Sequence, residues 1–390
     1  MNSLALILAI VSLLIWVVLT FLRGGFWQLL PFDDDISKQE PLARWPRIVT
    51  IVPARNEAET IARTVESLVK QEYAGELGLV VVDDHSEDGT GALAEEAAER
   101  AGASERVLIL KSAALESGWT GKLLAMQQGV ESDIGRDAEY FWFTDADIEH
   151  APDTLRRIVQ RAERDKLDLV SLMALSQINS LPERLLIPPF LYFFLKLYPP
   201  SWIASTKRKT AGAAGGCILL RRAALERIGG LAAIRSEVID DCTMARAVKR
   251  TGGGLWMGLT RKSVSLRTYT SFTEIQDLIA RTAFTQLGYS GLALAGTLLG
   301  MLITYLLPVI FTFGAQPVVW RLGLTAWALM AITYLPTVRF YRMSPVWAAA
   351  LPVAAAFYTY ATWVSAVRYW LGRGGQWKGR SQAPVKSSIQ

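Results

Sequence analysis

The stretch Phe-Trp-Phe-Thr-Asp-Ala-Asp, residues 141–147, is an apolar run that ends in two carboxylates one residue apart. On an extended strand, residues i and i+2 share a face, so Asp145 and Asp147 would point into the same cleft. In open α/β sheets, ligands bind outside the carboxyl ends of the strands. Carboxylate oxygens suit a hard divalent cation and a diphosphate that the cation carries. Taken alone, such a pair is more often a solvated turn or a helix cap, so the rest of the chain decides its meaning.

The composition of the 390 residues bounds the class of protein. Hydrophobic residues make up 51%, the mean hydropathy is +0.24 and the net charge is +5. This small positive excess, without a basic stripe of interleaved aromatic residues, argues against a nucleic-acid partner. The 13 Trp and 12 Tyr fit a membrane protein with aromatic side chains at the bilayer interface. Cys217 and Cys242 offer neither a disulfide framework nor zinc spacing, so we expect buried, reduced thiols.

Apolar segments lie towards the two ends of the chain. Leu4–Leu22 is an uncharged run long enough to cross a bilayer, and no cleavage site follows it, so we expect a retained transmembrane helix within residues 1–25. Three further apolar stretches follow in the C-terminal third: 289–313, 318–337 and 346–367. They predict a C-terminal transmembrane region over residues 289–371, followed by a basic tail over 372–390.

The basic residues give an orientation. No Lys or Arg precedes Leu4, and Arg23 follows the first span, which predicts a multi-pass protein of the cell inner membrane with a cytoplasmic central block. Three C-terminal spans would nevertheless leave the basic tail outside. We therefore expect one stretch to be re-entrant, and Pro308 makes the first of the three the candidate.

The central block, residues 45–270, alternates strand and helix patterns. Short apolar runs predict strands over 48–52, 79–82, 107–110 and 140–144. Helical patterns lie between them, over 57–70, 91–101 and 122–130. This alternation predicts an α/β fold with a Rossmann-like, mostly parallel sheet. The segment 271–288 is amphipathic, and we expect an interfacial helix that lays one face on the bilayer.

Polar motifs follow three of the predicted strands. Pro53-Ala-Arg-Asn-Glu57 follows the first strand, Asp83-Asp84 follows the second, and Asp145-Ala-Asp147 follows the last. Each motif alone fits a turn or a helix start. Because the carboxyl ends of parallel strands meet at one edge of a sheet, their recurrence predicts a single shared site.

Other candidates lie outside these strand ends. Lys122 sits in a loop before a helix, where it meets phosphates or lies at the surface. Gly212–Gly216 permits a ligand to approach the backbone, although its spacing is not that of a phosphate-binding loop. Asp240 and Asp241 open a helical segment, which suits the helix dipole, and a carboxylate in a partly desolvated cleft also suits a general base. His150 either approaches the metal or lies solvated in its loop.

In order and spacing, these motifs resemble those of inverting family 2 glycosyltransferases with the GT-A fold. The matching elements are Pro53–Glu57, Val82–Asp84, Thr144–Asp147 and Ile239–Asp241. The resemblance covers roughly residues 45–290. It implies a GT-A catalytic domain over 45–270, between the N-terminal transmembrane helix and the C-terminal transmembrane block.

The resemblance and the position of the loops also imply roles for single residues. The nucleotide sugar would be held by Pro53, Arg55, Glu57, Asp84, Lys122, Asp145 and Arg281. Asp147 and Asp145 would hold Mg²⁺ or Mn²⁺, with Asp147 the more direct ligand. Asp241 would be the general base, beside Asp240 where the family usually has Glu. Arg281 lies on the amphipathic segment and would reach the diphosphate, or else a lipid headgroup.

The N-terminal span, Gly118-Trp-Thr-Gly-Lys122 and the C-terminal block look closer to hopanoid-associated glycosyltransferases, which are similar to ceramide glucosyltransferases. This resemblance implies a membrane-bound hexosyltransferase that moves a sugar from a nucleotide sugar, expected to be a UDP-sugar, to a hopanoid or sphingolipid-like hydroxyl. Ceramide glucosyltransferases and processive synthases carry Gln/Arg-x-x-Arg-Trp where this chain has Leu278-Ile-Ala-Arg281-Thr, so only the arginine matches. A processive polysaccharide synthase or a polyprenyl-phosphate glycosyltransferase is the alternative.

Two other classes fit the sequence less well. A nucleotidyltransferase would carry a Gly- and Lys-rich loop after the first strand, where this chain has Pro53–Glu57. A transporter or a membrane scaffold without enzymatic activity would carry ionisable residues inside its spans. The apolar runs hold little charge apart from Arg321, which lies near a boundary.

Overall fold

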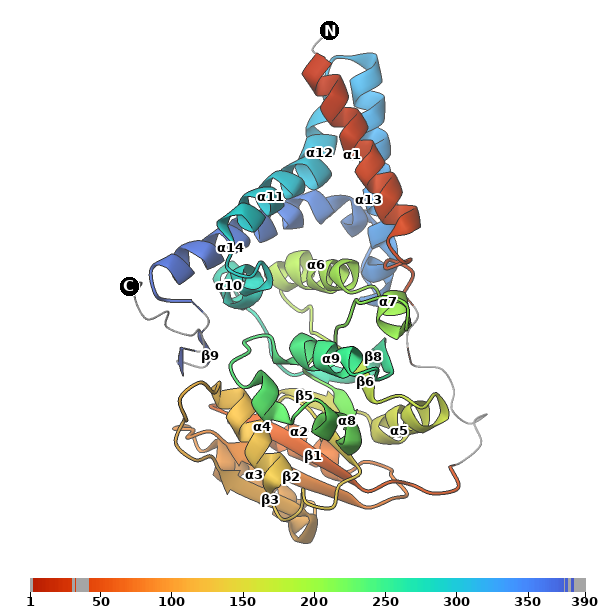
Figure 1. The fold of residues 1–390 in the computed structure, drawn as a ribbon. Coiled ribbons are helices and arrows are strands. Elements are labelled where there is room, and N and C mark those ends of the chain that lie inside the picture. The colour runs from red at the N-terminus through yellow and green to blue at the C-terminus, as the bar shows by residue number, and fades with distance from the viewer. Residues whose placement is uncertain (1–2, 30–31, 33–41, 375, 378–379, 382–390) are drawn as a thin grey trace. The chain divides into compact units, whose positions relative to one another are not determined.

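The structure is a computed structural model that describes residues 3–29, 32, 42–374, 376–377 and 380–381 (Figure 1). The chain forms two compact units, each built from segments that are distant in sequence. The sheet unit comprises Leu30–Gln177, Trp202–Arg267 and Trp377–Gln390. The helical unit comprises Met1–Leu29, Ile178–Ser201 and Thr268–Gln376.

A mixed eight-stranded sheet forms the sheet unit, with strand order β3-β2-β1-β4-β7-β6-β8-β5. The strands are β1 (Ile48–Ala54), β2 (Leu77–Asp83), β3 (Val107–Lys111), β4 (Tyr140–Phe143), β5 (Ile148–His150), β6 (Leu169–Leu175), β7 (Ile218–Arg221) and β8 (Leu255–Ser265). β1 pairs in parallel with β2 and β4, and β2 with β3. β7 runs antiparallel to both β4 and β6, β8 runs parallel to β6, and β5 runs antiparallel to β8. Six of the eight strands, β1–β4, β6 and β8, therefore run in one direction and only β7 and β5 oppose them, so the sheet is mixed but mostly parallel, as expected.

Helices connect these strands. They are α2 (Ile61–Val69), α3 (Thr90–Arg100), α4 (Gly121–Glu131), α5 (Thr154–Arg164), α8 (Arg222–Arg227) and α9 (Asp240–Arg250), with short helical turns η2 (Ser104–Arg106) and η3 (Leu231–Ile234). The strands and helices predicted within residues 48–144 are all present, with bounds moved by a few residues. β1 continues through Pro53, because β4 ends opposite Ile51 and leaves β1 with a neighbour on one side only.

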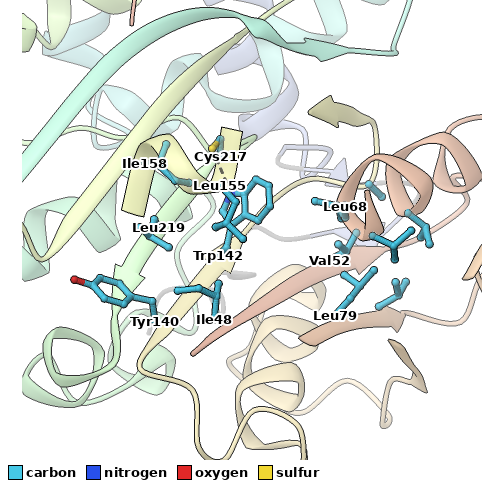
Figure 2. Packing of buried hydrophobic residues seen from close by; sticks show 14 of the residues in the cluster. Ile48, Val52, Leu68, Leu79, Tyr140, Trp142, Leu155, Ile158, Cys217 and Leu219 are labelled. Atoms are coloured by element: carbon cyan, nitrogen blue, oxygen red, sulfur yellow. Dashed lines mark hydrogen bonds between the residues drawn. The ribbon is translucent and has the colours of Figure 1, made fainter. Parts of the chain in front are cut away.

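The core of the sheet unit holds β1 and β4 in place. Figure 2 shows Ile48 of β1 and Trp142 of β4 among buried side chains that include Leu155 of α5. The buried indole Nε1 of Trp142 donates a hydrogen bond to Sγ of Cys217 at 3.3 Å, as a buried indole N–H requires a partner. Cys217 and Cys242 are both buried free thiols, which confirms the expectation from the sequence.

Helices from both ends of the chain form the helical unit. They are α1 (Ser3–Leu22), α10 (Phe272–Gln286), α11 (Gly291–Met301), the π-helical turn η4 (Leu302–Leu306), α12 (Leu307–Thr312), α13 (Pro317–Phe340), η5 (Pro345–Ala350) and α14 (Leu351–Trp370). Within the part of the chain that the structure describes, four stretches are long and apolar enough to cross a membrane: Ser3–Leu22, Gly291–Thr312, Pro317–Phe340 and Pro345–Trp370. The predicted basic tail lies outside the described residues, except for 372–374, β9 (Gln376–Trp377) and β10 (Arg380–Ser381).

One helix of this unit was not anticipated. α6 (Leu181–Leu197) lies within the central block of the sequence but packs among the apolar helices. The Tyr192 hydroxyl lies 2.8 Å from the Thr333 hydroxyl of α13, and the Tyr358 hydroxyl of α14 donates to the Leu186 carbonyl at 2.8 Å. The 17 residues of α6 are too few and too charged to have been recognised as a membrane segment. The short helix α7 (Pro200–Ala204) follows it.

The helical path is continuous through Pro308. Proline lacks an N–H, so the carbonyl four residues earlier loses its helical donor. The Trp16 indole donates to the Thr304 carbonyl, and the Ser12 hydroxyl donates to the Ile303 carbonyl, each at 2.7 Å. Two side chains of α1 therefore satisfy the carbonyls that the π-helical turn and Pro308 leave open.

Candidate active site

The loops after β1 and β2 are tied to each other. The Arg55 guanidinium donates to the backbone carbonyl of Asp84 and lies 3.8 Å from its carboxylate, and both side chains are buried. The Asn56 N–H donates to the Ser86 hydroxyl at 3.0 Å, and Asn56 Oδ1 accepts from the Glu87 N–H at 2.9 Å. These bonds bring Arg55 and Asp84 together at the carboxyl edge of the sheet, as the recurrence of polar loops predicted.

The loop of Asp145 and Asp147 has a fixed backbone. The Thr60 and Thr64 hydroxyls of the α2 region donate to the Ala146 carbonyl at 3.0 and 2.9 Å. The Asp147 carbonyl accepts from the Leu266 N–H, after β8, at 2.7 Å. The sequence predicted that the two aspartates extend a strand, but β4 ends at Phe143 and they lie in a turn. Their side chains consequently have different partners.

Lys122 is the partner of Asp145. Its ammonium lies 2.8 Å from Asp145 Oδ1 and 3.2 Å from Asp240 Oδ2, so it joins the loop after β4 to the start of α9. The Thr120 side chain caps α4, where Lys122 occupies the first turn. Burial opposes the charge on Lys122, but the attraction of Asp145 and Asp240 outweighs burial and raises the pKa of Lys122. The ammonium therefore stays charged at every pH at which the enzyme would work.

Asp241 lies next to this ion cluster in the first turn of α9. Its carboxylate accepts hydrogen bonds from the N–H of Gly215 at 3.0 Å and of Cys242 at 2.6 Å. Burial raises the pKa of Asp241 to about 6, with a further contribution from the neighbouring charge of Asp240. At neutral pH the group is therefore ionised but close to its titration range, which suits a general base.

Gly215 explains the glycine-rich segment before β7. A Cβ at this position would lie 3.3 Å from the Lys122 ammonium and 3.6 Å from carboxylate oxygens of Asp145 and Asp241. The three groups therefore surround one backbone position. A side chain at Gly215 would intrude among them, which accounts for glycine here.

Arg267 completes the site, and the sequence analysis missed it. Its Nε lies 3.1 Å from Asp147, and its Nη2 lies 3.0 and 3.3 Å from the two carboxylate oxygens of Glu57. Burial and the charge of Asp145 raise the pKa of Asp147 to about 6, and Arg267 opposes that rise. Arg267 follows β8, whose carboxyl end shares the edge of β4 through β7 and β6. The only signal in the sequence was its place after a strand that the analysis did not predict.

Asp145 and Asp147 fit a divalent cation that binds together with a phosphate-bearing ligand. Among the residues that the structure describes, no three His, Cys, Asp or Glu side chains are grouped to hold a metal by themselves. Mg²⁺ and Mn²⁺ take one or two protein carboxylates and complete their coordination with phosphate oxygens and water. Asp145 and Asp147, on one short loop, fit such a site.

Three candidates from the sequence need separate mention. His150 is not solvated: it is buried, its two ring nitrogens lie against the hydroxyls of Thr144 and Ser263, and burial lowers its pKa to about 3. Pro53 is a buried residue of β1, the last but one before the loop that follows this strand. Arg281 belongs to α10 of the helical unit, and its role stays a prediction.

Comparison with known proteins gives a family for part of this unit. Residues 49–229 match the family model described as glycosyl transferase family 2. The matched stretch contains the loops after β1, β2 and β4, and it ends before the two aspartates that open α9.

Two curated relatives match shorter stretches. A probable glycosyltransferase YdaM from Bacillus subtilis (strain 168) is 32% identical over 119 residues, which cover 27% of this chain and 28% of that protein. An uncharacterised protein from Methanocaldococcus jannaschii is 27% identical over 124 residues, which cover 32% of this chain and 50% of that protein. The matches thus span between about a quarter and a half of these relatives.

A solved structure matches nearly the whole chain. The mannosyltransferase PcManGT from Pyrobaculum calidifontis, in complex with GDP-Man and Mn²⁺, superposes with a TM-score of 0.56 at 18% sequence identity. The superposition covers 93% of this chain and 99% of that one. At this identity the likeness shows a shared fold. The expectation of a GT-A-like α/β fold is confirmed as a mixed sheet, and the apolar helices are candidates for membrane spans.

Proposed function

We propose that this chain, which contains a family 2 glycosyltransferase domain in residues 49–229, is a membrane-bound enzyme that transfers a sugar from a nucleotide-sugar donor to a lipid hydroxyl with inversion. The observation that carries the proposal is the half-buried Asp241 carboxylate, whose pKa is raised, beside Lys122 and Asp145. Three charged groups from three different elements meet there, next to the loops that follow β1 and β4.

Asp241 is the proposed general base. Its carboxylate takes the proton of the acceptor hydroxyl while the acceptor oxygen bonds to the anomeric carbon. The bond from that carbon to the donor's phosphate oxygen breaks, and the diphosphate leaves with the electron pair. Two backbone N–H groups hold the carboxylate of Asp241 in one orientation, so its remaining lone pairs face the acceptor in a fixed direction. Asp240 is a positioning residue that fixes Lys122 beside the base.

The donor site is formed by residues of the strand-end loops. Pro53 and Arg55 set the course of the loop after β1, and Asp84 lies behind Arg55 as an acceptor for the base or ribose. Glu57 and Asp147 share Arg267, whose single positive charge offsets part of the charge of these two half-buried carboxylates. A divalent cation, Mg²⁺ or Mn²⁺, held by Asp145 and Asp147 would stabilise the charge of the leaving diphosphate. The P. calidifontis mannosyltransferase, of the same fold, was solved with GDP-Man and Mn²⁺, which supports this class of ligand.

The helical unit supports a lipid acceptor. Four candidate spans and the amphipathic α10 would place the enzyme at a bilayer, where lipid hydroxyls are the abundant acceptors. Arg281 on α10 stays a proposed ligand of the donor diphosphate, as its place on the amphipathic segment of the sequence suggested. The acceptor class to test first is a hopanoid or a sphingolipid-like lipid, with a UDP-sugar as the donor. From the distribution of basic residues in the sequence, we propose that the catalytic domain lies in the cytoplasm.

The test is an assay of the purified full chain. The protein is incubated with Mn²⁺, a panel of UDP- and GDP-sugars and a membrane lipid extract, and glycosylated lipids are identified by mass. Asp241→Asn should lower kcat by about 10²–10⁴-fold, because the acceptor loses its base. Glu237→Gln, which changes an exposed carboxylate four residues earlier, should leave kcat unchanged. Normal turnover by folded Asp241→Asn would exclude Asp241 as the base, and sugar transfer to a soluble acceptor alone would exclude the lipid.

A further inference from the structure

We infer that α14 lies in the membrane–water interface beside α10 instead of crossing the bilayer, and that its exposed aromatic face is a lipid-binding surface. This inference rests on the membrane association proposed above, and it is independent of the sugar and of the acceptor. By length and hydropathy, Pro345–Trp370 is one of four candidate spans. Its packing along α10 inside the helical unit instead places it at the membrane–water interface.

The depth of α10 is set by its charges. Glu274 and Asp277 are both exposed on this helix, and Arg281 lies one turn further along. Exposed carboxylates are costly in the hydrocarbon region, where ionisable side chains are rare and face the interior of a helix bundle. An amphipathic helix of this kind lies in the plane of the interface with its apolar side towards the lipid.

α14 runs alongside α10 over most of the length of α10. Phe357 packs on Phe272 with ring centroids 6.0 Å apart, and Tyr369 packs on Phe284 at 5.5 Å. Between these contacts, the Ser365 hydroxyl accepts from the Phe284 N–H at 3.0 Å and donates to a carbonyl of α10. The contacts advance in the same direction along both helices. Residues 357–370 therefore share the depth of α10.

An ion pair also joins the two helices. The Arg368 guanidinium of α14 lies 2.7 Å from the Asp277 carboxylate of α10, and both side chains are partly exposed. In Figure 1, α1 and α13 run beside each other, whereas the helix contacts of α14 are greatest with α10.

The outer face of α14 has the composition of an interfacial surface. Tyr360, Trp363 and Trp370 are exposed by 55%, 45% and 55%, and with Val353 they form one stripe along the helix. Tyr and Trp prefer the headgroup level, where the ring is in contact with apolar chains and the polar atom with water. This stripe therefore contacts the headgroup region of a phospholipid bilayer.

Three spans remain, and they pack together. α12 and α13 approach closely at Gly323, where a Cβ would lie 2.8 Å from the Pro308 carbonyl oxygen, and small residues of this kind favour helix contacts in membranes. With α1, Gly291–Thr312 and α13 as spans, the chain returns to the cytoplasmic side before α14. The basic residues that follow spans then share that side: Arg23, Arg339, Arg342, Arg368 and Arg373. If α14 does not cross the bilayer, the basic tail stays on the cytoplasmic side, and the conflict with the positive-inside rule is removed. The helix that contains Pro308 then crosses the bilayer and is not re-entrant.

The depth of α14 can be measured directly in the full chain. An environment-sensitive fluorophore is attached at Tyr360→Cys, near the middle of the candidate span, in phospholipid vesicles. Ile332→Cys, an exposed position in the middle of α13, is the matched control. Quenchers near the lipid headgroups should quench the label at 360, and quenchers near the chain ends should quench the label at 332. Equal deep quenching at both positions would overturn the inference.

The side of the C-terminal end gives an independent readout. In intact cells, a membrane-impermeant maleimide should label Ala315→Cys, between α12 and α13, but should label Arg373→Cys only after permeabilisation. The parent chain, whose two thiols are buried, is the control for background. Labelling of Arg373→Cys in intact cells would show that α14 spans. Failure to label Ala315→Cys would instead contradict the membrane orientation proposed for the whole chain, whatever the activity.

Discussion

At the scale of single residues, Lys122 sets the electrostatics of the site. It touches Asp145 of the β4 loop and Asp240 of α9, and its charge lowers the pKa of Asp241, which burial and Asp240 raise. A lysine predicted to meet phosphates is thus held between two carboxylates. Its charge keeps the neighbouring base ionised at neutral pH.

The raised pKa of Asp241 predicts an acid limb in the rate profile. The base accepts a proton only in its ionised form, so kcat/KM should fall as the pH drops below about 6, by about tenfold per pH unit far below that value. The measurement is kcat/KM for the purified enzyme over a pH series, with the fold monitored at each pH. A limb near pH 4 would mean that the base is a solvated carboxylate and not Asp241.

Removal of the Lys122 charge should move that limb. Because Lys122 lowers the pKa of Asp241, Lys122→Met should raise this pKa, so the fall in kcat/KM should begin at a higher pH than in the parent enzyme. Lys111→Met, which changes an exposed lysine at the end of β3, should leave the limb in place. A loss of rate in Lys122→Met that is the same at every pH would show that the lysine acts on the donor only.

Sequence reasoning reached most of the ionisable groups of the site but not their pairing. Asp145, Asp147, Asp240 and Asp241 were recognised as candidates from their place at strand and helix ends. Arg267 was not, because it lies 210 residues from Glu57 and follows a strand that the local pattern did not reveal. Which carboxylate faces which cation depends on the order of the strands.

At the scale of elements, Pro308 shows how a helix break is repaired by another helix. The Trp16 indole and the Ser12 hydroxyl of α1 donate to the two carbonyls that lose their helical donors. In a bilayer such carbonyls have no water to bind, so the repair must come from the protein. The sequence indicated a re-entrant segment at Pro308, and the tertiary contacts explain why the helix continues instead.

A double-mutant cycle tests this repair. Trp16→Phe should destabilise the helical unit by about 1 kcal/mol, the scale of a hydrogen bond inside a membrane protein. In the Pro308→Ala background the backbone N–H is restored and donates to the Thr304 carbonyl, so the same change should cost less. The free energy of unfolding is measured in mixed micelles by titration with a denaturing detergent. Equal costs in both backgrounds would show that the indole contributes packing alone.

At the scale of the whole molecule, the chain interleaves its two units. α6 leaves the sheet unit after β6 and joins the apolar helices, and the chain then returns to form β7. The catalytic domain that the sequence predicts over residues 45–270 is therefore interrupted by α6, which belongs to the helical unit. Its apolar segment, α6, is connected by hydrogen bonds to α13 and α14.

Ligand binding should stabilise the sheet unit. At 100 times its Kd, a nucleoside diphosphate with Mn²⁺ should raise the free energy of unfolding by about 2.7 kcal/mol. Asp147→Ala should abolish the part of this gain that depends on Mn²⁺, whereas Asp133→Ala, at a side chain exposed by 90%, should retain it. Thermal unfolding is compared with UDP and with GDP, with and without the cation. An undiminished Mn²⁺ effect in Asp147→Ala would exclude Asp147 as a metal ligand.

The sequence by itself determined the parts whose signals are local: the strands and helices of residues 48–144, the apolar helices, and the acidic residues at strand and helix ends. These follow from side-chain periodicity and from the turn chemistry next to each element. Only the tertiary structure decided which charges meet, because Lys122 with Asp145 and Arg267 with Asp147 join segments that are brought together by strand order alone. It also decided the place of α6 and α14, whose apolar faces have several possible partners in the sequence and one set of neighbours in the fold.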